Sequence, residues 1–149
     1  MKLNPDCIRD VLIYLEENLE YVNREDVLIE HREITLSTIK EELHTKNSYE
    51  YIDIIYSVEK LIEVDYITAS HINRMAGNSK YIDGIVDITW QGHQSLNTIR
   101  PKTVWEATKK GASKLGIMSM HALATIAEKV ADVVVTNPDI INQIVANIK

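Results

Sequence analysis

Five histidines and one cysteine are the side chains of this 149-residue chain best suited to metal or nucleophilic chemistry. Zinc ligands usually come in closely spaced pairs. The histidines are too far apart for that pattern; they are His31, His44, His71, His93 and His121. Cys7 is the single cysteine, and its place early in a predicted helix favours a small buried hydrophobe over a nucleophile. The sequence therefore predicts no metal site and no cofactor.

Local patterns that organise catalysis are also missing from the sequence. It has no glycine-rich phosphate loop, and no nucleophile elbow that would anchor a Ser-His-Asp group. We expect a protein that is not an enzyme, takes no small-molecule substrate and acts by binding.

The clearest candidates for binding are polar and basic residues in the second half of the chain. Arg74, Asn78 and Lys80 lie in a short polar stretch, and a second basic group surrounds Pro101. Such cations bind phosphate groups by releasing counterions. The predicted nucleic-acid contacts are Arg74, Asn78, Lys80, Arg100, Lys102, Lys109, Lys110 and Lys114.

The net charge of −6 is unevenly distributed along the chain. Residues 1–65 hold 7 Lys/Arg against 16 Asp/Glu, a net charge of −9, whereas residues 66–149 hold 9 against 6, a net charge of +3. We expect carboxylates to gather on one side of the molecule and cations on another. Because the acidic half repels phosphate, DNA would be contacted through the second half.

A protein interface is the alternative function, and it would use the acidic half. Ser48 is predicted to cap a helix with its buried face at Ile52, Ile55, Tyr56, Leu61 and Ile62. Its outward residues would be Tyr49, Glu50, Asp53, Ser57 and Lys60. Tyrosines beside carboxylates suit a protein surface better than a phosphate surface. The DNA and protein hypotheses both stay open at this point.

Helix-forming segments precede these residues and position them. Asn4-Pro5-Asp6 predicts a helix start, and this helix should end near Glu20–Asn23. One short strand is expected around His31–Ile34, followed by a brief helix over Leu36–Leu43. Its cap is Thr38, Thr35 or Ser37. Asn47 and Asp65 are residue types that tolerate left-handed turns.

A β-hairpin is expected next, with its tip at Met75–Lys80. Ile82, Val86 and Ile88 should face inward, with Asp83 and Asp87 outward. Thr89 then caps a helix in which Gly92 permits a close approach to the hairpin base. Two helices, a short turn and a hairpin together predict a winged helix-turn-helix of the α+β class over residues 1–100.

A helical extension is predicted over residues 101–149. Thr103–Leu115 should form a helix ending at Gly116, and Asn137-Pro138-Asp139 should end the next one. Between them runs an apolar seam that either packs back on the domain or pairs two copies as a homodimer. The seam consists of Met120, Leu123, Ala127, Val130 and Val134. Trp90 and Trp105 are expected to be core anchors.

No membrane segment is expected. The opening MKLNPDC turns polar before an apolar run develops, and the apolar tract near Val130–Val135 is far shorter than the roughly 20 residues of a span. We expect a cytoplasmic protein.

Three blocks of the chain resemble a domain-of-unknown-function family of small bacterial, prophage and phage proteins common in Gram-positive genomes. The blocks are LNPDCIRDVLIYLEE, YIDIIYSVEKLIEVDYI and DITWQGHQSLNTIRPKTVW, and ITWQGHQSLNTIR is the most specific part. Ser95 departs from the bulky apolar residue often found there in the family. The resemblance implies a winged-helix-like, non-enzymatic protein of a mobile element that acts inside a bacterial cell. We expect a regulatory role, and on the protein hypothesis the partner would be a host or phage protein, including one that it inhibits in anti-defence.

Overall fold

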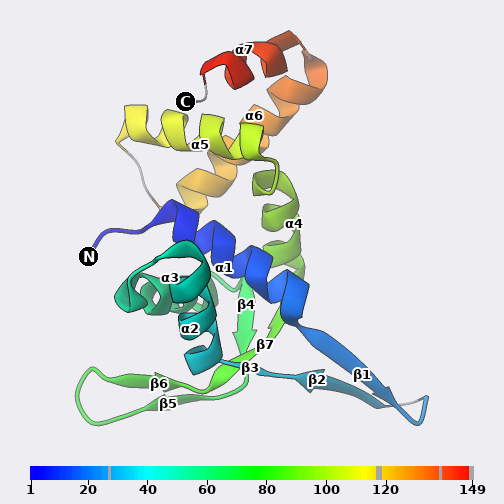
Figure 1. Ribbon diagram of the computed structural model, residues 1–149, viewed down its shortest axis with the longest axis vertical. Helices are drawn as coiled ribbons and strands as arrows, with labels where there is room; N and C mark the ends of the chain where they lie inside the picture. Colours follow the sequence, from blue (N-terminus) through cyan, green and yellow to red (C-terminus); the bar gives the residue numbers. More distant parts are fainter. Residues whose placement is uncertain (27, 117–118, 138, 148–149) are drawn as a thin grey trace. The chain divides into compact units, whose positions relative to one another are not determined.

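The computed structural model describes residues 1–26, 28–116, 119–137 and 139–147. The chain divides into two compact units, Asn4–His93 with Lys2 and Gln94–Lys149 with Met1 and Leu3. Helices and short antiparallel sheets both occur, which confirms the α+β class. Figure 1 shows the elements in chain order.

Three helices form the core of the first unit: α1 (Pro5–Asn18), α2 (Leu36–Asn47) and α3 (Tyr51–Glu63). Helix α1 begins as predicted, because the Asn4 side chain accepts a hydrogen bond from the Cys7 amide at 3.2 Å. It ends at Asn18, short of the predicted Glu20–Asn23. Its apolar stripe packs on α2 and α3 and is fully buried at Val11, Leu12 and Leu15.

A three-stranded antiparallel sheet lies beside these helices, in the order β3 (Ile34–Thr35), β7 (Gly84–Ile88) and β4 (Ile67–Ala69). Ile82, Ile85 and Ile88 are buried, whereas Val86 is half-buried. The predicted inward position of Val86 is therefore wrong, and Ile85 occupies the buried position instead. Inward and outward side chains do not alternate strictly along residues 80–88. Asp83 interrupts the strand before β7, and the β4–β7 register shifts at Ala69.

Two separate β-hairpins accompany the sheet (Figure 1). In the first, β5 (Ile72–Arg74) pairs with β6 (Lys80–Ile82) around the expected tip. The Met75 amide donates to the Ser79 carbonyl at 2.9 Å, and Gly77 has a φ of +79°, which only glycine adopts freely. Because Lys80 begins β6, the tip is one residue shorter than predicted.

The second hairpin, which we call the arm, consists of β1 (Glu20–Arg24) and β2 (Leu28–Arg32). The prediction of one strand around His31–Ile34 is wrong here: Glu20–Arg32 forms two strands, and β3 follows separately. Glu25 and Asp26 turn the chain with φ values of 57° and 56°. The Tyr21 hydroxyl donates to Asp87 of β7 and attaches the arm to the sheet.

The turn between α2 and α3 differs from the prediction. Thr35 caps α2 by accepting from the Thr38 amide at 3.1 Å, which resolves the three predicted alternatives. Ser48 does not cap α3; with a φ of 59° it is the left-handed residue that ends α2. Helix α3 begins after Glu50, and Asp65, after its end, is left-handed as expected.

The buried face of α3 is rotated from the predicted one. Its core residues are Ile54, Ser57, Val58 and Leu61, so only Leu61 of the predicted buried set is fully enclosed. Ile52 is exposed, and Ile55, Tyr56 and Ile62 are half-buried. The apolar residues of YIDIIYSVEKLIE fit more than one helical stripe, and the stripe with the small Ser57 is the one that packs on α1.

Helix α4 (Trp90–Ile99) begins where the sequence predicts. The Thr89 hydroxyl accepts from the Gly92 amide at 3.1 Å and donates to the Asp65 carbonyl at 2.6 Å. Gly92 is buried against the start of β4 and the end of β7, the base of the predicted hairpin. A Cβ atom added to it would lie 2.1 Å from the Tyr66 carbonyl oxygen. The predicted close approach at Gly92 is confirmed.

The second unit contains α5 (Lys102–Leu115), α6 (Met120–Thr136) and α7 (Asp139–Asn147). Gly116 ends α5 with a φ of 68°, as predicted. Met120, Leu123 and Ala127 are buried within their own chain, which favours the packing-back alternative for this part of the seam, whereas Val130 and Val134 are half-buried. No helix among the described residues is long and apolar enough to cross a membrane.

Candidate binding surface

Exposed apolar side chains on α3 and β6 mark a candidate binding surface. Ile52 is 59% exposed and Tyr81 is 55% exposed. Ile55 lies one helical turn from Ile52, and it lines the same groove as Tyr81. We call Ile52, Ile55, Glu59, Lys80 and Tyr81 the α3–β6 surface.

The charges on this surface are paired. The Lys80 ammonium lies 2.6 Å from the Glu59 carboxylate and joins β6 to α3. On the next turn of α3, Lys60 bridges Glu63, which raises the pKa of Lys60 and lowers that of Glu63. Both pairs are open to solvent and contribute little to stability. Their effect is to leave the surface nearly neutral around its apolar side chains.

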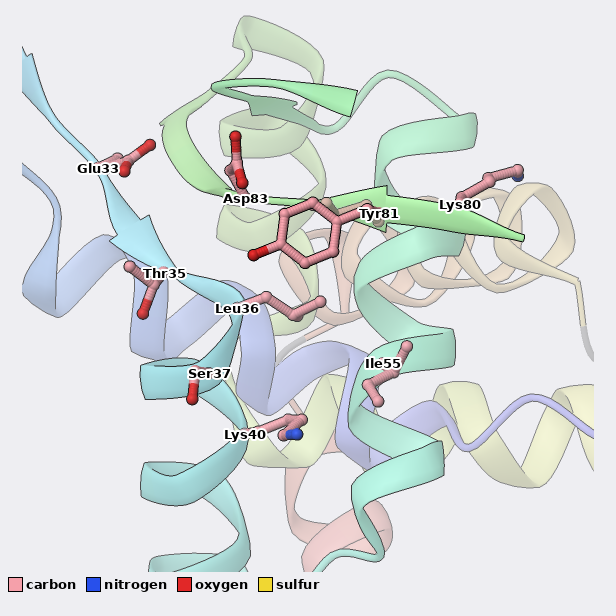
Figure 2. A pocket seen from close by; sticks show the side chains of 10 residues that line it. Glu33, Thr35, Leu36, Ser37, Lys40, Ile55, Lys80, Tyr81 and Asp83 are labelled. Carbon is pink, nitrogen blue, oxygen red and sulfur yellow. The ribbon is translucent and has the colours of Figure 1, made fainter. Parts of the chain in front are cut away.

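A groove of about 490 Å³ opens between α2, α3 and β6. Figure 2 shows the Tyr81 ring above Leu36, with Ile55 across the groove on α3. Glu33 and Asp83 lie toward one end and Lys80 toward the other, while Lys40 approaches from α2. The volume falls in the range of ordinary ligand pockets, and the lining mixes apolar and charged groups.

The predicted protein-binding residues do not form one face. Ser57 is fully buried, so its outward placement is wrong. Tyr49 is half-buried, Asp53 accepts from the Asn4 side chain at 3.4 Å, and only Glu50 is well exposed. Lys60 follows Glu59 on α3 and forms an ion pair with Glu63. The rotation of α3 explains these differences.

Tyr49 instead belongs to a polar cluster on α1. The Asp10 carboxylate accepts from the Tyr49 hydroxyl at 2.7 Å and from the Asn47 amide at 2.9 Å. His44 hydrogen-bonds the Tyr49 carbonyl at 2.7 Å. Burial, and then the hydrogen bond to Asp10, raise the pKa of Tyr49. This cluster fixes the turn between α2 and α3 to α1.

The predicted nucleic-acid residues lie in both units. Arg74, Asn78 and Lys80 are exposed on the β5–β6 hairpin, and the remaining five lie in the second unit. Lys80 bridges Glu59, and Lys109 bridges Glu106 at 3.1 Å while lying over the Trp105 ring. At Lys80 and Lys109 the expected separation of positive and negative charge is therefore wrong, because each ammonium group lies beside a carboxylate.

Several exposed residues escaped the sequence-based prediction. Ile52 was expected in the core, and Tyr81 directly follows the predicted tip, where no apolar binding residue was expected. Trp105 is buried as expected, but Trp90 is 77% exposed, so its role as a core anchor is wrong. Trp90 is the first residue of α4, where Gly92 and Ile88 make the inward contact. In the sequence, Trp90 is marked only by its place in the ITWQGH block that resembles the family.

Cys7 is fully buried on α1, next to Ser57 of α3. Burial raises the pKa of its thiol from 9.0 to about 11, and the neighbouring Ser57 hydroxyl offsets only part of this shift. A reactive cysteine requires the opposite shift. The structure thus favours the packing interpretation of Cys7.

The raised pKa of Cys7 predicts a loss of stability in alkali. The folded state holds the thiol proton that the unfolded chain releases from pH 9, so this contribution is present below pH 9 and is lost toward pH 11. Between pH 9 and 10 the free energy of unfolding should fall by about 1 kcal/mol more in the wild type than in Cys7→Ala. Urea denaturation across this range measures the difference; identical slopes would contradict the prediction.

No group of three or more His, Cys, Asp or Glu side chains in the described part of the chain could hold a metal ion.

The model of one protein family, described as hypothetical protein (DUF2513), matches residues 2–118, which is most of the chain. No curated protein matches, and no solved structure matches.

Proposed function

The chain belongs to the DUF2513 family of hypothetical proteins, and we propose that it is a non-enzymatic winged-helix protein that acts by binding another protein. The binding site is the α3–β6 surface. The family description names no activity, so the proposal rests on the residues of this chain. Its resemblance to phage and prophage proteins suggests a regulatory role inside a bacterial cell, with a host or phage protein as the partner.

The order of elements supports the winged-helix assignment. Helix α1, strand β3, helices α2 and α3, and strands β4 and β7 follow one another, and the sheet order is β3-β7-β4. A hairpin, β5–β6, extends between β4 and β7 as a wing would. The arm is an addition between α1 and β3. Helix α3 then occupies the position of the helix that reads the DNA groove in such folds.

One observation carries the choice of a protein partner: α3 exposes the apolar side chain of Ile52, and its carboxylates at Glu59 and Glu63 are already paired with lysines. Ile52 is 59% exposed, while Glu59 pairs with Lys80. Groove binding by this helix would release Lys80 from Glu59 and leave a carboxylate facing phosphate. A protein partner can instead cover Ile52 and Tyr81, since apolar and aromatic side chains dominate interface cores.

Replacement of Ile52 by glutamate tests this proposal. The partner is first captured by affinity purification of the tagged chain from cells that contain it, with protein and nucleic acid both identified. Ile52→Glu should weaken binding of the purified partner at least tenfold, because a charge would be buried in the interface core. The fold should be unaffected, since Ile52 is exposed. Isothermal titration calorimetry measures the affinity and thermal denaturation the stability.

The arm provides the matched control. Ile29 is 69% exposed on β2, and Ile29→Glu makes the same chemical change away from the proposed site. This variant should bind the partner as the wild type does. Equal binding by wild type, Ile52→Glu and Ile29→Glu would overturn the assignment of the α3–β6 surface.

DNA binding through the wing is a second candidate function, and Arg74 is the observation that favours it. Arg74 is exposed on β5 beside the glycine turn, and among the described residues no ion pair is formed by it. An unpaired arginine at a hairpin tip can enter a minor groove. Asn78 is exposed at the same tip.

Salt-dependent binding to a random-sequence 30-base-pair duplex separates this candidate from the first. If the wing binds DNA, fluorescence anisotropy should show an affinity that falls steeply with salt, and Arg74→Ala should reduce the salt slope by about one unit. Ile52→Glu should then leave DNA binding unchanged. Absence of binding at 50 mM salt would exclude this candidate.

A further inference from the structure

The outer edge of β6 carries backbone groups that no strand of the described chain covers. Strand β6 pairs with β5 alone. The Asp83 amide donates to the His71 carbonyl at 3.1 Å and the Met75 amide to the Ser79 carbonyl at 2.9 Å, so by alternation the backbone groups of Tyr81, which is opposite Asn73, face β5. The backbone groups of Lys80 and Ile82 therefore face the opposite edge. An open edge of this kind accepts another strand readily.

The open edge exists because β3 ends early. Strand β3 runs antiparallel to β7, with Ile34 opposite Ile85 and Thr35 opposite Gly84. At Thr35 the chain caps α2 and leaves the sheet, and the Leu36 amide makes a last bond to the Asp83 carbonyl at 3.0 Å. A longer β3 would have continued alongside Ile82 and Lys80. The groove lies at this place, beyond the end of β3 and beside β6.

The groove has side chains suited to an extended segment. Leu36, Ile55 and the half-exposed Tyr81 give apolar contacts, and they come from α2, α3 and β6 (Figure 2). Residues 80–83 all line the groove, so the edge of β6 is accessible along its length. At about 3.3 Å per residue, four or five residues of an added strand would cover it.

The charges at the two ends of the groove set the polarity of the occupant. Asp83 lies where β3 ends and Glu33 just before β3 begins, on the same side of the groove, and Lys80 lies at the far end of β6. An added strand that continues the direction of β3 runs antiparallel to β6, with its first residue near Asp83 and its last near Lys80. A basic residue at its start would complement Glu33 and Asp83, and an acidic residue at its end would take the place of Glu59 beside the Lys80 ammonium.

We propose that the groove binds an extended segment of the partner protein, which adds to the edge of β6 as an antiparallel strand. The segment has a basic residue three or four positions before an acidic one, with apolar residues between them. Main-chain hydrogen bonds to Lys80 and Ile82 supply affinity, and the apolar and charged contacts supply specificity. This mode of binding rests on the proposed protein-binding function and specifies it further.

Selection from a displayed library of random nine-residue peptides on the full chain tests the sequence preference. The enriched peptides should carry Lys or Arg before Asp or Glu at that spacing. The same selection on the Lys80→Glu, Asp83→Lys double variant should enrich the reverse order. Circular dichroism checks that the variant is folded. An enriched motif without charge order, or one unchanged by the double variant, would overturn the proposed polarity.

N-methylation of a selected peptide tests strand addition itself. Methylation of every second amide, those facing β6, should weaken binding at least tenfold, while methylation of the alternate amides should change the affinity less than threefold. The amide resonances of Lys80 and Ile82 should shift on binding. Uniform effects of methylation, or unshifted resonances, would overturn strand addition. In that case, a loss of partner binding in the Ile52→Glu variant would still support the proposed protein-binding function. Failure of strand addition can therefore be distinguished from failure of the proposed function.

Discussion

Gly92→Ala is expected to destabilise the first unit by about 4 kcal/mol or more, the largest effect among the glycine-to-alanine changes in this chain. A Cβ at this position would lie 2.1 Å from the Tyr66 carbonyl oxygen and 2.8 Å from the Ile88 side chain. The nearest atom is backbone, so the clash is relieved only by moving α4 away from the sheet. Ordinary overpacking costs about 1–3 kcal/mol, and a fixed backbone oxygen makes the cost larger. Thermal and urea denaturation measure the change.

Gly111→Ala is the matched control, because it makes the same substitution inside a helix. The added Cβ would lie 3.3 Å from the Ile126 side chain, which can move, and alanine favours the helix by about 1 kcal/mol. The free energy of unfolding of this variant should stay within about 1 kcal/mol of the wild type. A Gly92→Ala variant as stable as Gly111→Ala would show that α4 does not pack closely on the Tyr66 carbonyl.

Asp10→Ala should destabilise the first unit by about 2–3 kcal/mol. The carboxylate accepts from the Tyr49 hydroxyl at 2.7 Å and from the Asn47 amide at 2.9 Å, and Asp10 is mostly shielded from solvent. Hydrogen bonds to a charged group contribute roughly 1.5–3 kcal/mol, and their loss leaves a half-buried hydroxyl without its acceptor. The turn that fixes the start of α3 should loosen, which amide hydrogen exchange of residues 48–54 would detect.

Tyr49→Phe removes one of these hydrogen bonds and keeps the ring. It should cost about 1 kcal/mol, and the double variant with Asp10→Ala should cost less than the sum of the two. Asp10→Asn keeps an acceptor and should lie between wild type and Asp10→Ala. Additive effects would mean that Asp10 and Tyr49 stabilise the fold independently.

The elements whose start and end signals are local could be predicted from sequence. The Asn4-Pro5 start, the Thr89 cap and the Gly116 end all occur as expected, since each depends on one side chain and its nearest amides. The close approach at Gly92 was also predictable, because an isolated glycine early in a helix has few other reasons to be there.

The arm could not be predicted for an equally physical reason. Its turn is made by Glu25 and Asp26 in the left-handed region, where glycine or asparagine would normally announce a hairpin. The segment Leu19–Val22 also continues the apolar spacing of α1, which extended the predicted helix. Attachment of Tyr21 to Asp87 is a long-range contact that no local pattern reports.

The candidate site was predicted only in outline. The sequence indicated that this helix and hairpin carry the binding residues, but the apolar residues of α3 fit two stripes, and the stripe that packs is not the predicted one. Packing against Cys7 decides between them, because the small Ser57 fits there. Choosing that stripe turns Ile52 outward and Ser57 inward. The pairing of Lys80 with Glu59 joins residues 21 positions apart and was equally out of reach.

The arm has a consequence for how the chain can vary in length. Its strands pair with each other from Glu20 to Arg32, and the hydrogen bond of Tyr21 to Asp87 joins its base to the sheet. Residues could be added or removed in pairs at the outer end, around Glu25 and Asp26, while Ile34 stays opposite Ile85. The outer end of the arm is therefore the natural place to insert a tag or fluorophore without disturbing the helices or the groove.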